Sequence, residues 1–409
     1  MRIMVQKFGG TSVADIERMK MVRGKVTAVL DKGYKVVVVL SARAGKTNKL
    51  LELTTRWAGV PDAAEVDSLL STGEQASVAL FSMLLNDSGI RARSYLGWQI
   101  PIVTNDNFGS ARILSIDADK IRSALETYDV IVVAGFQGIT EDGRITTLGR
   151  GGSDTSAVAL AAALDSCECE IYTDVEGVYT TDPNMCSTAR KLERVTYDEM
   201  LEMASMGAKV LQIRSVEFAK KYNVPVRVRS TFSEDPGTLV AKEEEAMMES
   251  VLVSGIAYDK DQARITLCGL PDKPGIAASI FSPLSQNHIM VDMIIQTASR
   301  EGVTDMTFTV SRKDLDKALT LMKEKVAEVG GSGIESAPRV SKVSVIGVGM
   351  RNHTGVAARA FKVLHDENIN ILMISTSEIK ISCLIDEKYT ELAVRTLHDA
   401  FNLGEAVQA

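Results

Sequence analysis

Two segments of this sequence are apolar without interruption, and they limit the fold more than any other feature. They are VVVVL at 36–40 and VIVVAG at 130–135. A strand with one wet face alternates apolar and polar residues, whereas a strand covered on both faces, as in a parallel sheet between helices, is continuously apolar. Five segments are candidate strands of such a sheet: Met4–Phe8, Lys35–Ser41, Val130–Gly135, Glu170–Thr173 and Val224–Arg229.

Segments with helical character lie between these strands, at Val13–Asp31, Glu74–Asp87 and Ser153–Leu164. The alternation of strand and helix predicts a three-layer α/β domain around a mostly parallel central sheet. In sheets of this kind a ligand binds beyond the carboxyl ends of the strands. The polar and glycine-rich segments that follow the strands are therefore the candidates for a functional site.

The last third of the chain contains an internal repeat. Gly275–Gln296 aligns with Gly355–Thr376 at a constant spacing of 80 residues (275 and 355 for the first pair). Each copy reads as strand, turn, helix and strand, followed by a further strand and helix, which predicts two tandem βαββαβ units. Two such units usually pack sheet to sheet, within one chain or between chains. A duplicated scaffold that binds no ligand is the alternative interpretation.

An acidic segment at 242–250 precedes the repeat and lacks turn residues, so we expect it to connect two domains. The expected domains are residues 1–245, 246–335 and 336–409. A typical size of roughly 150 residues per domain predicts two or three domains for a chain of 409 residues.

The formal net charge of −7 argues against a nucleic-acid partner, which normally requires a basic surface. No apolar run approaches the ~18 residues needed to cross a membrane. The N-terminus reaches Gly9 and Gly10 too early for a signal peptide. We therefore expect a soluble, cytoplasmic protein without a membrane partner. The five cysteines include no CxxC pair and no nearby set of zinc ligands, which favours structural thiols.

All four histidines lie in the last third of the chain, at His288, His353, His365 and His398. Histidine is thereby excluded from any chemistry in the first 245 residues. Such chemistry must use lysine, arginine, carboxylates and backbone groups.

The segment KFGGTS at 7–12 follows the first expected strand and precedes a helix. Two adjacent glycines let the backbone approach a phosphate and donate N–H groups to it. Thr11 or Ser12 can cap the following helix, whose N-terminus favours an anion. The segment is neither a Walker A loop nor a dinucleotide-binding GxGxxG motif. A tight β–α turn without a ligand is the alternative.

A second glycine-rich segment, LGRGGSDTSA at 148–157, also precedes a helix. Ser153 or Asp154 can cap that helix. The carboxylate of Asp154 can also orient a lysine amine toward a transferring group, whereas a simple N-cap is the alternative. Two such turns on one domain suit the two ends of a phosphoryl-transfer reaction.

Six motifs in this chain are similar, in order and approximate spacing, to those of the aspartate kinase family. They are KFGGTS, LLSTGE (69–74), LGRGGSDTSA, TDVEGVYTTDP (173–183), GAKVL (207–211) and LQIRSVEFA (211–219). The C-terminal repeat resembles the paired ACT domains of that family, so the resemblance covers essentially the whole chain. It implies a three-layer amino-acid-kinase fold followed by two ferredoxin-like ACT domains.

The resemblance implies transfer of the γ-phosphate of MgATP to the β-carboxylate of L-aspartate. The product, 4-phospho-L-aspartate, begins the biosynthesis of lysine, threonine and methionine. A carboxylate with a pKa of ~3.9 is already an anion at neutral pH, so the reaction needs no general base. Charge stabilisation comes from lysines, backbone N–H groups and Mg²⁺. We expect the metal to be held mainly by the ATP phosphates and not by protein ligands.

The resemblance also assigns roles to individual residues. Those implied to bind ATP are Lys7, Phe8, Gly9, Gly10, Thr173, Asp174, Tyr179, Asp182 and Lys209. Those implied to bind aspartate are Ser41, Thr47, Glu74, Arg150, Gly151, Gly152 and Ser153. Lys7, Asp154 and Lys209 are the implied catalytic residues. Arg150 matches the arginine that grips the α-carboxylate, in a bidentate fork that lysine cannot reproduce, and Glu74 matches the partner of the substrate amine.

Paired ACT domains imply regulation by lysine, threonine or both. The matching effector contacts are Asp272, Lys273, Pro274, Gly275, Ile276, Ala277, Asp292, Gln296, Ile369, Asn370 and Thr376. Asp292 offers a carboxylate to an ammonium group, and the turn at Gly275 offers N–H groups to a carboxylate. Met290 stands where relatives often have Asn, so we expect unequal sites, with the stronger one around 272–277 and 370–376. A homodimer or higher oligomer through the ACT domains is expected, with a shorter regulatory subunit from an internal start at Met247–Met248 as an option.

Some positions depart from the family pattern, and two other functions stay open. Arg43 and Lys46 add positive charge near the expected pocket, or face solvent, and Phe108 replaces a residue that is often His in relatives. One alternative function is another kinase of the same fold, acting on glutamate or acetylglutamate; the ACT pair and Arg150 argue against it. The other is an amino-acid sensor with an inactive kinase half. The retained residues Lys7, Glu74, Arg150, Asp154 and Lys209 argue against loss of activity.

Overall fold

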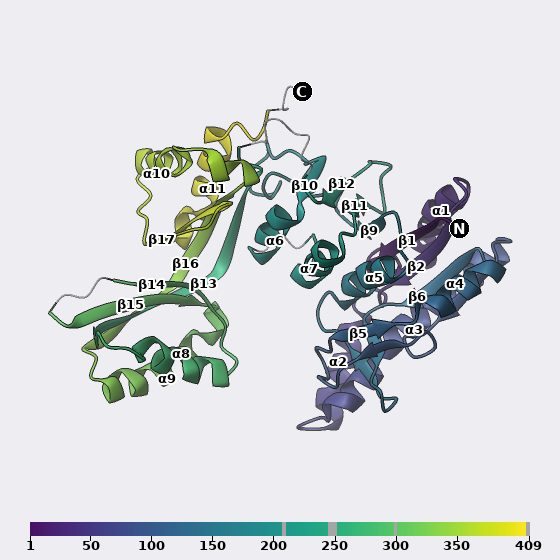
Figure 1. Cartoon of the computed structure of the whole chain (residues 1–409), viewed down its shortest axis with the longest axis horizontal. Helices are drawn as coiled ribbons and strands as arrows, with labels where there is room; N and C mark the ends of the chain where they lie inside the picture. Colours follow the sequence, from purple (N-terminus) through teal and green to yellow (C-terminus); the bar gives the residue numbers. More distant parts are fainter. Residues whose placement is uncertain (207–209, 244–251, 298–300, 406–409) are drawn as a thin grey trace. The chain divides into compact units, whose positions relative to one another are not determined.

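A computed structural model describes residues 1–206, 210–243, 252–297 and 301–405, except for the side chains of Arg351 and Asn352. The chain forms two compact units (Figure 1). The first unit comprises Met1–Val178 and Lys191–Met247, and the second comprises Tyr179–Arg190 and Met248–Ala409. Among the helices of these ranges, none is long and apolar enough to cross a membrane.

The first unit is built around an eight-stranded sheet with the strand order β10-β12-β11-β9-β1-β2-β6-β3. Its strands are parallel except for the antiparallel pair β11 and β12. A separate four-stranded sheet has the strand order β5-β4-β7-β8. The elements are β1 (Ile3–Phe8), α1 (Ile16–Leu30), β2 (Lys35–Leu40), α2 (Lys46–Trp57), α3 (Ala63–Asp87), β3 (Ala92–Tyr95), β4 (Ile102–Thr104), β5 (Ile113–Ile116), α4 (Ala118–Thr127), β6 (Val130–Ala134), β7 (Gln137–Ile139), β8 (Ile145–Thr147), α5 (Gly152–Ala163), β9 (Cys169–Thr173), β10 (Arg194–Thr196), α6 (Tyr197–Ser205), α7 (Ile213–Tyr222), β11 (Val226–Ser230) and β12 (Thr238–Ala241).

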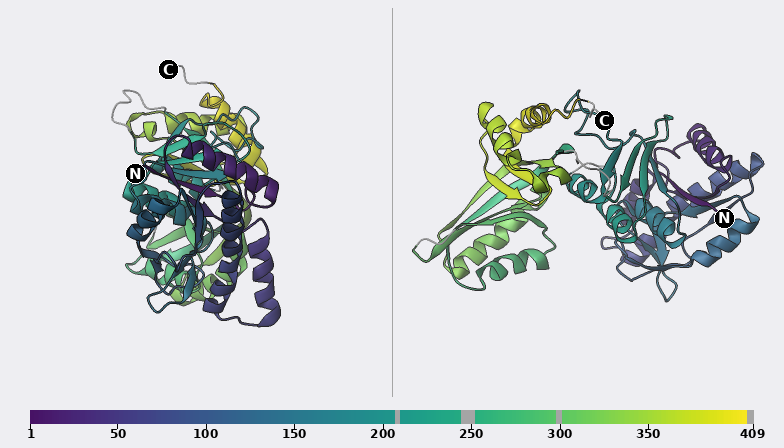
Figure 2. Two further views of the ribbon diagram at one scale, coloured as in Figure 1. Left: turned by 90° about the vertical axis from the view of Figure 1, so that its right-hand side faces the viewer. Right: turned by 45° about the horizontal axis from the view of Figure 1, so that its top comes forward.

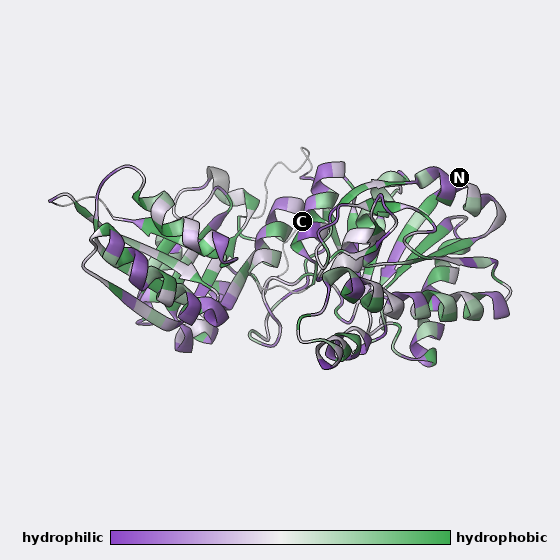
Figure 3. Ribbon diagram, turned by 90° about the horizontal axis from the view of Figure 1, so that it is seen from below, coloured by the Kyte–Doolittle hydropathy of each residue, from purple (hydrophilic) through white to green (hydrophobic). Residues whose placement is uncertain are grey.

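Helices cover both faces of the large sheet, which explains the uninterrupted apolar runs. Val36 and Val38 of β2 belong to a buried core with residues of α1 and α3. Val37 and Val39 point to the opposite face and are equally buried, and α5 packs against β1 and β2. The strands are largely hydrophobic, whereas the surrounding helices carry alternating hydrophobic and hydrophilic bands (Figure 3). The predicted three-layer α/β architecture is confirmed.

All five predicted strands of this sheet are present, with ends that differ by at most two residues. The predicted helix at Glu74–Asp87 is part of a longer helix, α3, that begins at Ala63. The predicted caps are wrong. Asp15 caps α1 by accepting the N–H of Arg18, and Gly151 stands at the N-cap of α5 without any side-chain cap.

The second unit contains one six-stranded sheet with the strand order β14-β15-β13-β16-β18-β17. All of its neighbouring strands are antiparallel. Figure 2 shows the two long strands, β13 and β16, running through this unit. The elements are β13 (Gly255–Pro271), α8 (Ile276–Gln286), β14 (Val291–Gln296), β15 (Val303–Val310), η1 (Arg312–Asp314), α9 (Leu315–Val329), β16 (Gly333–Ile346), η2 (Val348–Asn352), α10 (Val356–Asp366), β17 (Met373–Thr376), β18 (Lys380–Asp386), η3 (Glu387–Tyr389) and α11 (Thr390–Ala400).

The internal repeat is visible in the helices and cores of the second unit. Helices α8 and α10 both follow a glycine with positive φ, Gly275 (94°) and Gly355 (99°). The buried residues Ile276, Ile280, Leu284 and Ile289 form one core. Their counterparts 80 positions later, Val356, Ala360, Leu364 and Ile369, occupy the other core. The two copies are therefore equivalent ferredoxin-like units, as predicted.

The two copies lie side by side in one sheet and are not packed sheet to sheet within the chain. The end of β13 nearest the N-terminus, residues 255–259, pairs with 342–346 of β16 in the second copy. The rest of β13, from Ala263, pairs with β15 of the first copy. A strand that precedes the first copy thus completes the sheet of the second. The domain boundaries drawn from the sequence stay a prediction.

Candidate active site

The candidate site lies at the carboxyl ends of adjacent parallel strands, where the sequence predicted it. The chain segments that leave these strands are tied together by backbone hydrogen bonds. The N–H of Gly9 donates to the carbonyl of Tyr172 at 3.3 Å, and the N–H of Ser41 donates to the carbonyl of Phe8 at 3.2 Å. The N–H of Gly135 donates to the carbonyl of Leu40 at 3.0 Å. These bonds bring KFGGTS, Ser41 and the end of β6 to one edge of the sheet.

A buried ion pair joins the two glycine-rich motifs. Lys7 Nζ lies 2.6 Å from the Asp154 carboxylate, and each side chain is about one-tenth exposed. Lys7 is on β1, and Asp154 is in the first turn of α5. Of the two roles considered for Asp154, the orientation of a lysine amine matches this geometry. The simple N-cap does not, because Asp154 lies inside the helix.

Close backbone approach explains the glycines of both turns. A Cβ atom on Gly10 would lie 2.6 Å from the carbonyl oxygen of Ala42. Gly151 has a φ of 70°, and a Cβ there would overlap the side chain of Gln212. Larger residues at either position would separate the strands and helices that meet here. Ser12 does not cap a helix; its hydroxyl is hydrogen-bonded to that of Thr231 at 2.7 Å.

Glu74 is a buried carboxylate with one unused oxygen. It lies in the middle of α3 and is only 3% exposed. One carboxylate oxygen accepts the N–H of Ala42 at 2.9 Å, and the other has no hydrogen-bond partner. Burial raises the pKa of Glu74 to about 7, although the bond from Ala42 opposes that shift. A buried acceptor without a partner is costly, so this position is suited to a ligand that brings a positively charged donor.

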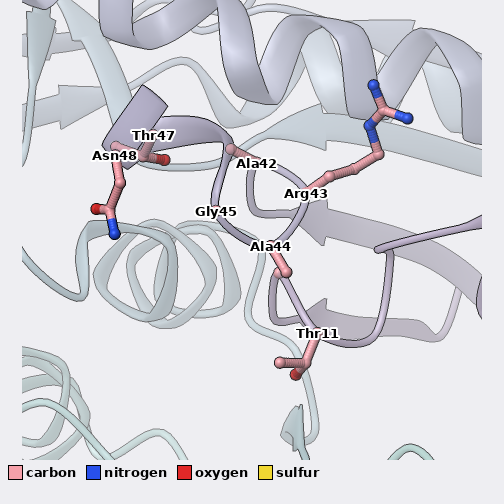
Figure 4. A pocket seen from close by; sticks show the side chains of 8 residues that line it. Thr11, Ala42, Arg43, Ala44, Gly45, Thr47 and Asn48 are labelled. Atoms are coloured by element: carbon pink, nitrogen blue, oxygen red, sulfur yellow. The ribbon is translucent and has the colours of Figure 1, made fainter. Parts of the chain in front are cut away.

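A pocket of about 380 Å³ opens beside these residues. It is lined by Gly10, Thr11, Ala42, Arg43, Ala44, Gly45, Thr47 and Asn48. Figure 4 shows that Thr11 and the loop at 42–45 face each other, and that the guanidinium of Arg43 points away from Thr11 and Thr47. Of the aspartate-binding residues predicted from the sequence, Thr47 lines this pocket directly. Thr11, Ala44 and Asn48 were not predicted.

The second glycine turn places its charged residue at an exposed position. Arg150 is exposed, whereas Gly152 and Ser153 are buried. A Cβ on Gly135 would lie 2.9 Å from the side chain of Ser153, so α5 begins in contact with the end of β6. The backbone of the turn therefore lies at the same sheet edge as Gly9 and Ser41.

The residues predicted on the adenosine side fall in different parts of the structure. Thr173 is the last residue of β9 in the first unit, Asp174 follows it, and the Thr173 hydroxyl donates to the Asp174 carboxylate at 3.0 Å. Tyr179 and Asp182 belong to the second unit. There, the Tyr258 hydroxyl donates to Asp182 at 2.9 Å. Burial, and to a smaller extent this bond, raises the pKa of Tyr258 to about 12. The predicted catalytic Lys209 lies outside the described residues.

The predicted effector contacts divide into buried and exposed groups. Ile276 and Ile369 are core residues of the two ACT-like copies. Asp292 on β14 already forms an ion pair with Lys342 of β16. The remaining predicted contacts are exposed: Asp272, Lys273, Pro274, Gly275, Ala277, Gln296, Asn370 and Thr376.

Two charged residues that hold the site together were missed. Asp67 on α3 and Arg214 on α7 bind backbone groups next to the second glycine turn. The motif LQIRSVEFA contains Arg214, and no residue in its last eight positions had an assigned role. This unassigned motif was the sequence signal that could have identified Arg214. A single Asp within a helix gives no such signal, since its partners are distant in the sequence.

Comparisons with known proteins agree with this arrangement. Residues 2–230 match the model of the amino acid kinase family, and residues 265–326 and 343–401 match that of the ACT domain. The chain is 54% identical to the aspartate kinase of Pseudomonas fluorescens (strain SBW25) over 405 residues, which are 98% of each protein.

Two crystal structures of E. coli aspartokinase III are also similar, each at 30% identity over 98% of this chain. The complex with aspartate and ADP (R-state) has a TM-score of 0.79 and is covered to 99%. The complex with lysine and aspartate (T-state) has a TM-score of 0.77 and is covered to 100%. By sequence along nearly its whole length, and by fold, the chain belongs to the aspartate kinase family.

Proposed function

We propose that the first unit transfers the γ-phosphoryl group of ATP to the β-carboxylate of L-aspartate, giving 4-phospho-L-aspartate and ADP. The observation that carries this proposal is the buried Lys7–Asp154 pair at the carboxyl ends of the strands. Glu74 presents an unpartnered carboxylate oxygen and is linked to the first glycine turn through Ala42, which binds Glu74 and approaches Gly10. The related E. coli enzyme, whose structure contains aspartate and ADP, supports the choice of substrates.

In the proposed step, an oxygen of the β-carboxylate attacks the γ-phosphorus while the bond to the β,γ-bridging oxygen breaks. ADP leaves, and no proton needs to move, because the attacking group is already an anion at neutral pH. Lys7 neutralises charge on the transferring group, and Asp154 keeps its ammonium group aimed. Fixed positive charge and backbone N–H groups act most strongly where water is excluded, and this pair is nine-tenths buried.

Aspartate is held at its two other charged groups. Arg150 binds the α-carboxylate through two parallel hydrogen bonds. Glu74 accepts from the substrate ammonium group, which satisfies its orphaned oxygen with a charge-assisted hydrogen bond. The other proposed contacts to aspartate are Ser41, Thr47, Gly151, Gly152 and Ser153.

ATP binds along the first glycine turn. The proposed contacts are Lys7, Phe8, Gly9, Gly10, Thr173, Asp174, Tyr179, Asp182 and Lys209, and Lys209 is proposed as a third catalytic residue. Mg²⁺, when bound, neutralises charge on the phosphates. In the part of the chain that the structure describes, no group of three His, Cys, Asp or Glu side chains is arranged to hold a metal. An ion held mainly by phosphate oxygens and water fits these residues, since Mg²⁺ typically takes few protein ligands.

The second unit is proposed to regulate the first. The two ACT copies provide the predicted effector positions, and the related E. coli structure with lysine supports lysine as one effector. Threonine, alone or together with lysine, is the other. We propose that the enzyme is a cytoplasmic homodimer or higher oligomer through its ACT domains and begins the pathway to lysine, threonine and methionine.

Replacement of Lys7 tests the catalytic proposal. Lys7→Met should lower kcat by about 10²–10³-fold, the range for removal of one preorganised charge-stabilising group. Lys25→Met is the matched control, because Lys25 is equally buried and also pairs with a carboxylate, Glu234, but lies on α1. Steady-state ADP release should distinguish the two variants. Full activity in Lys7→Met would contradict the proposal.

A parallel measurement with other acceptors tests the substrate. Wild-type rates with aspartate should exceed those with glutamate or acetylglutamate by at least about 100-fold, about 2.8 kcal/mol. Equal rates would favour another amino-acid kinase of this fold. No turnover of any acceptor would favour a sensor with an inactive kinase half.

A further inference from the structure

A fully buried carboxylate lies next to the turn that carries Arg150. Asp67 of α3 is 0% exposed and accepts three hydrogen bonds from uncharged groups. The N–H and the hydroxyl of Thr147 each donate to it at 2.7 Å, and the N–H of Gly109 donates at 2.9 Å. Thr147 is the last residue of β8, directly before the turn at 148–152. A single carboxylate thus fixes the start of that turn.

A guanidinium holds the same turn from another element. Arg214 of α7 donates to the carbonyl of Leu148 at 2.7 Å and to the carbonyl of Ala111 at 2.6 Å. The N–H of Ala111 in turn donates to the carbonyl of Thr147 at 2.9 Å. Arg214 and Asp67 therefore bind the same two segments, 109–111 and 147–148, from α7 and α3. We call these four parts together the turn clamp.

The turn itself contains conformational freedom that needs such support. Gly149 and Gly151 both have positive φ, 80° and 70°, and glycine loses the most backbone entropy when it is fixed. Arg150 stands between them and is exposed. A Cβ on Gly149 would lie 3.1 Å from the carbonyl oxygen of Gly109, so the turn is seated on the segment that Asp67 holds.

We propose that Asp67 and Arg214 are positioning residues that fix the turn at 148–152, so that Arg150 meets the α-carboxylate of the substrate. Neither residue touches the substrate in this proposal. Their charges suit the task, because hydrogen bonds to an ionised partner are about twice as strong as neutral ones. The planar guanidinium can also reach two carbonyl groups on separate segments at once.

This inference rests on the proposed role of Arg150, and the experiment separates the two claims. The variants are Asp67→Ala, Thr147→Val and Arg214→Met, with the conservative Asp67→Asn and Arg214→Lys. Asn can still accept both N–H groups and donate to the Thr147 hydroxyl, so it should restore much of the function lost in Asp67→Ala. Arg150→Met tests the role of Arg150 directly. The full-length protein is used throughout.

Three constants are measured for each variant: KM for aspartate, KM for ATP, and Ki for β-alanine, which is aspartate without its α-carboxylate. Asp67→Ala and Arg214→Met should raise the KM for aspartate by about 10- to 30-fold, equivalent to about 1.4–2 kcal/mol. The KM for ATP and the Ki for β-alanine should stay within about twofold of wild type. Thr147→Val should have a smaller effect in the same direction, because it removes one of the three bonds to Asp67.

Arg227→Met is the matched control for general destabilisation. Arg227 is partly buried and forms a two-point ion pair with Glu168, away from the turn. The melting temperature of the Arg227→Met variant should fall, while its KM for aspartate, its KM for ATP and its Ki for β-alanine stay unchanged. If Arg150→Met leaves the KM for aspartate unchanged, the proposed role of Arg150 is wrong. If Arg150→Met raises it but Asp67→Ala and Arg214→Met do not, or if they raise the Ki of β-alanine equally, the turn clamp is wrong.

Discussion

At the scale of one residue, Glu74 has the properties expected of the proposed partner for a positively charged substrate group. Its carboxylate is buried, and one of its oxygens has no partner. Because burial raises its pKa to about 7, the free enzyme holds Glu74 partly protonated at neutral pH. In the proposed complex, the ammonium group of the substrate supplies the missing partner and favours the ionised form. Under the proposed function, Glu74 therefore lowers the stability of the free protein and provides a contact for the substrate.

Glu74→Gln should separate these two effects. Between pH 4.5 and 7 the folded protein retains a proton that the unfolded chain has lost, so wild-type stability falls as the pH rises through this window. The full loss is about 3 kcal/mol, because the pKa in the folded protein is about 7 and the ordinary value is 4.5. Glutamine does not titrate, so the variant should gain on wild type in this window and keep that gain above pH 7. Thermal melting at pH 4.5, 6 and 8 measures the difference.

The same variant should lose aspartate affinity. Removing one charge-assisted hydrogen bond costs about 1.5–3 kcal/mol, which corresponds to an increase in KM for aspartate of about 10- to 150-fold. Glu52→Gln, at an exposed position on α2, is the control and should change neither property. An unchanged KM in Glu74→Gln would remove Glu74 from the substrate site.

Which individual residues meet was only partly predictable from the sequence. The proximity of Lys7 and Asp154 followed from two glycine turns at the ends of parallel strands. The cap residues did not follow. Ser12 and Asp154 satisfy the composition rule for a cap but bind residues of other segments, and Ser153 lies inside α5. Asp67 was not predictable at all, since its three donors lie 42 and 80 residues away.

At the scale of elements, α3 packs closely against the loop after β2, which lines the candidate pocket. A Cβ on Gly73 would lie 2.8 Å from the Cβ of Ala42, whose N–H binds the adjacent Glu74. In a helix interior, Gly→Ala normally stabilises by about 0.5–1 kcal/mol. Here we expect Gly73→Ala to move the loop at 42–45 and to lower kcat/KM for aspartate by about tenfold, about 1.4 kcal/mol.

The double variant Gly73→Ala with Ala42→Gly tests whether this contact is the cause. It transfers the methyl group from the loop to the helix, so the clash is removed while the total volume is kept. Most of the lost kcat/KM should return, with a coupling energy of about 0.5–3 kcal/mol between the two positions. Additive losses in the double variant would show that the approach of α3 to the loop does not shape the pocket.

The elements of the first unit were predictable where their burial follows a simple period. Strands β2 and β6 are covered on both faces, and their apolar runs predicted them closely. The first half of α3 was missed because buried polar residues, Asp67 and Ser71, interrupt its apolar pattern. Asp67 is buried because it binds segments distant in the sequence, which local sequence does not reveal, and the hydroxyl of Ser71 binds within its own helix.

At the scale of the whole molecule, the two ACT copies share one sheet. The repeat predicted the number and type of units. It did not predict that the first residues of β13 would pair with 342–346. The sequence of one long strand does not show which of its residues pair with which copy. The sheet of the second copy is therefore completed by a strand that precedes the first copy, so the two copies share a structural element.

Titration with lysine and threonine, singly and together, tests the proposed regulation. An effector that prefers the low-activity state by about 1–3 kcal/mol should change the apparent affinity for aspartate by about 5- to 150-fold. Asp292→Asn should weaken this response without changing the KM for ATP, because Asp292 is the proposed ammonium partner and pairs with Lys342 in the second unit. A rate that responds to neither amino acid would exclude the regulatory proposal.

The identity of the phosphorylated group tests the proposed function most directly. Purified enzyme is incubated with MgATP, aspartate and hydroxylamine, which traps an acyl phosphate as its hydroxamate, and the product is identified by mass spectrometry and ¹³C NMR. Phosphoryl transfer to the β-carboxylate predicts ATP-dependent aspartate β-hydroxamate, abolished in Lys7→Met and retained in Lys25→Met. An α-hydroxamate, or ADP release without any hydroxamate, would contradict it.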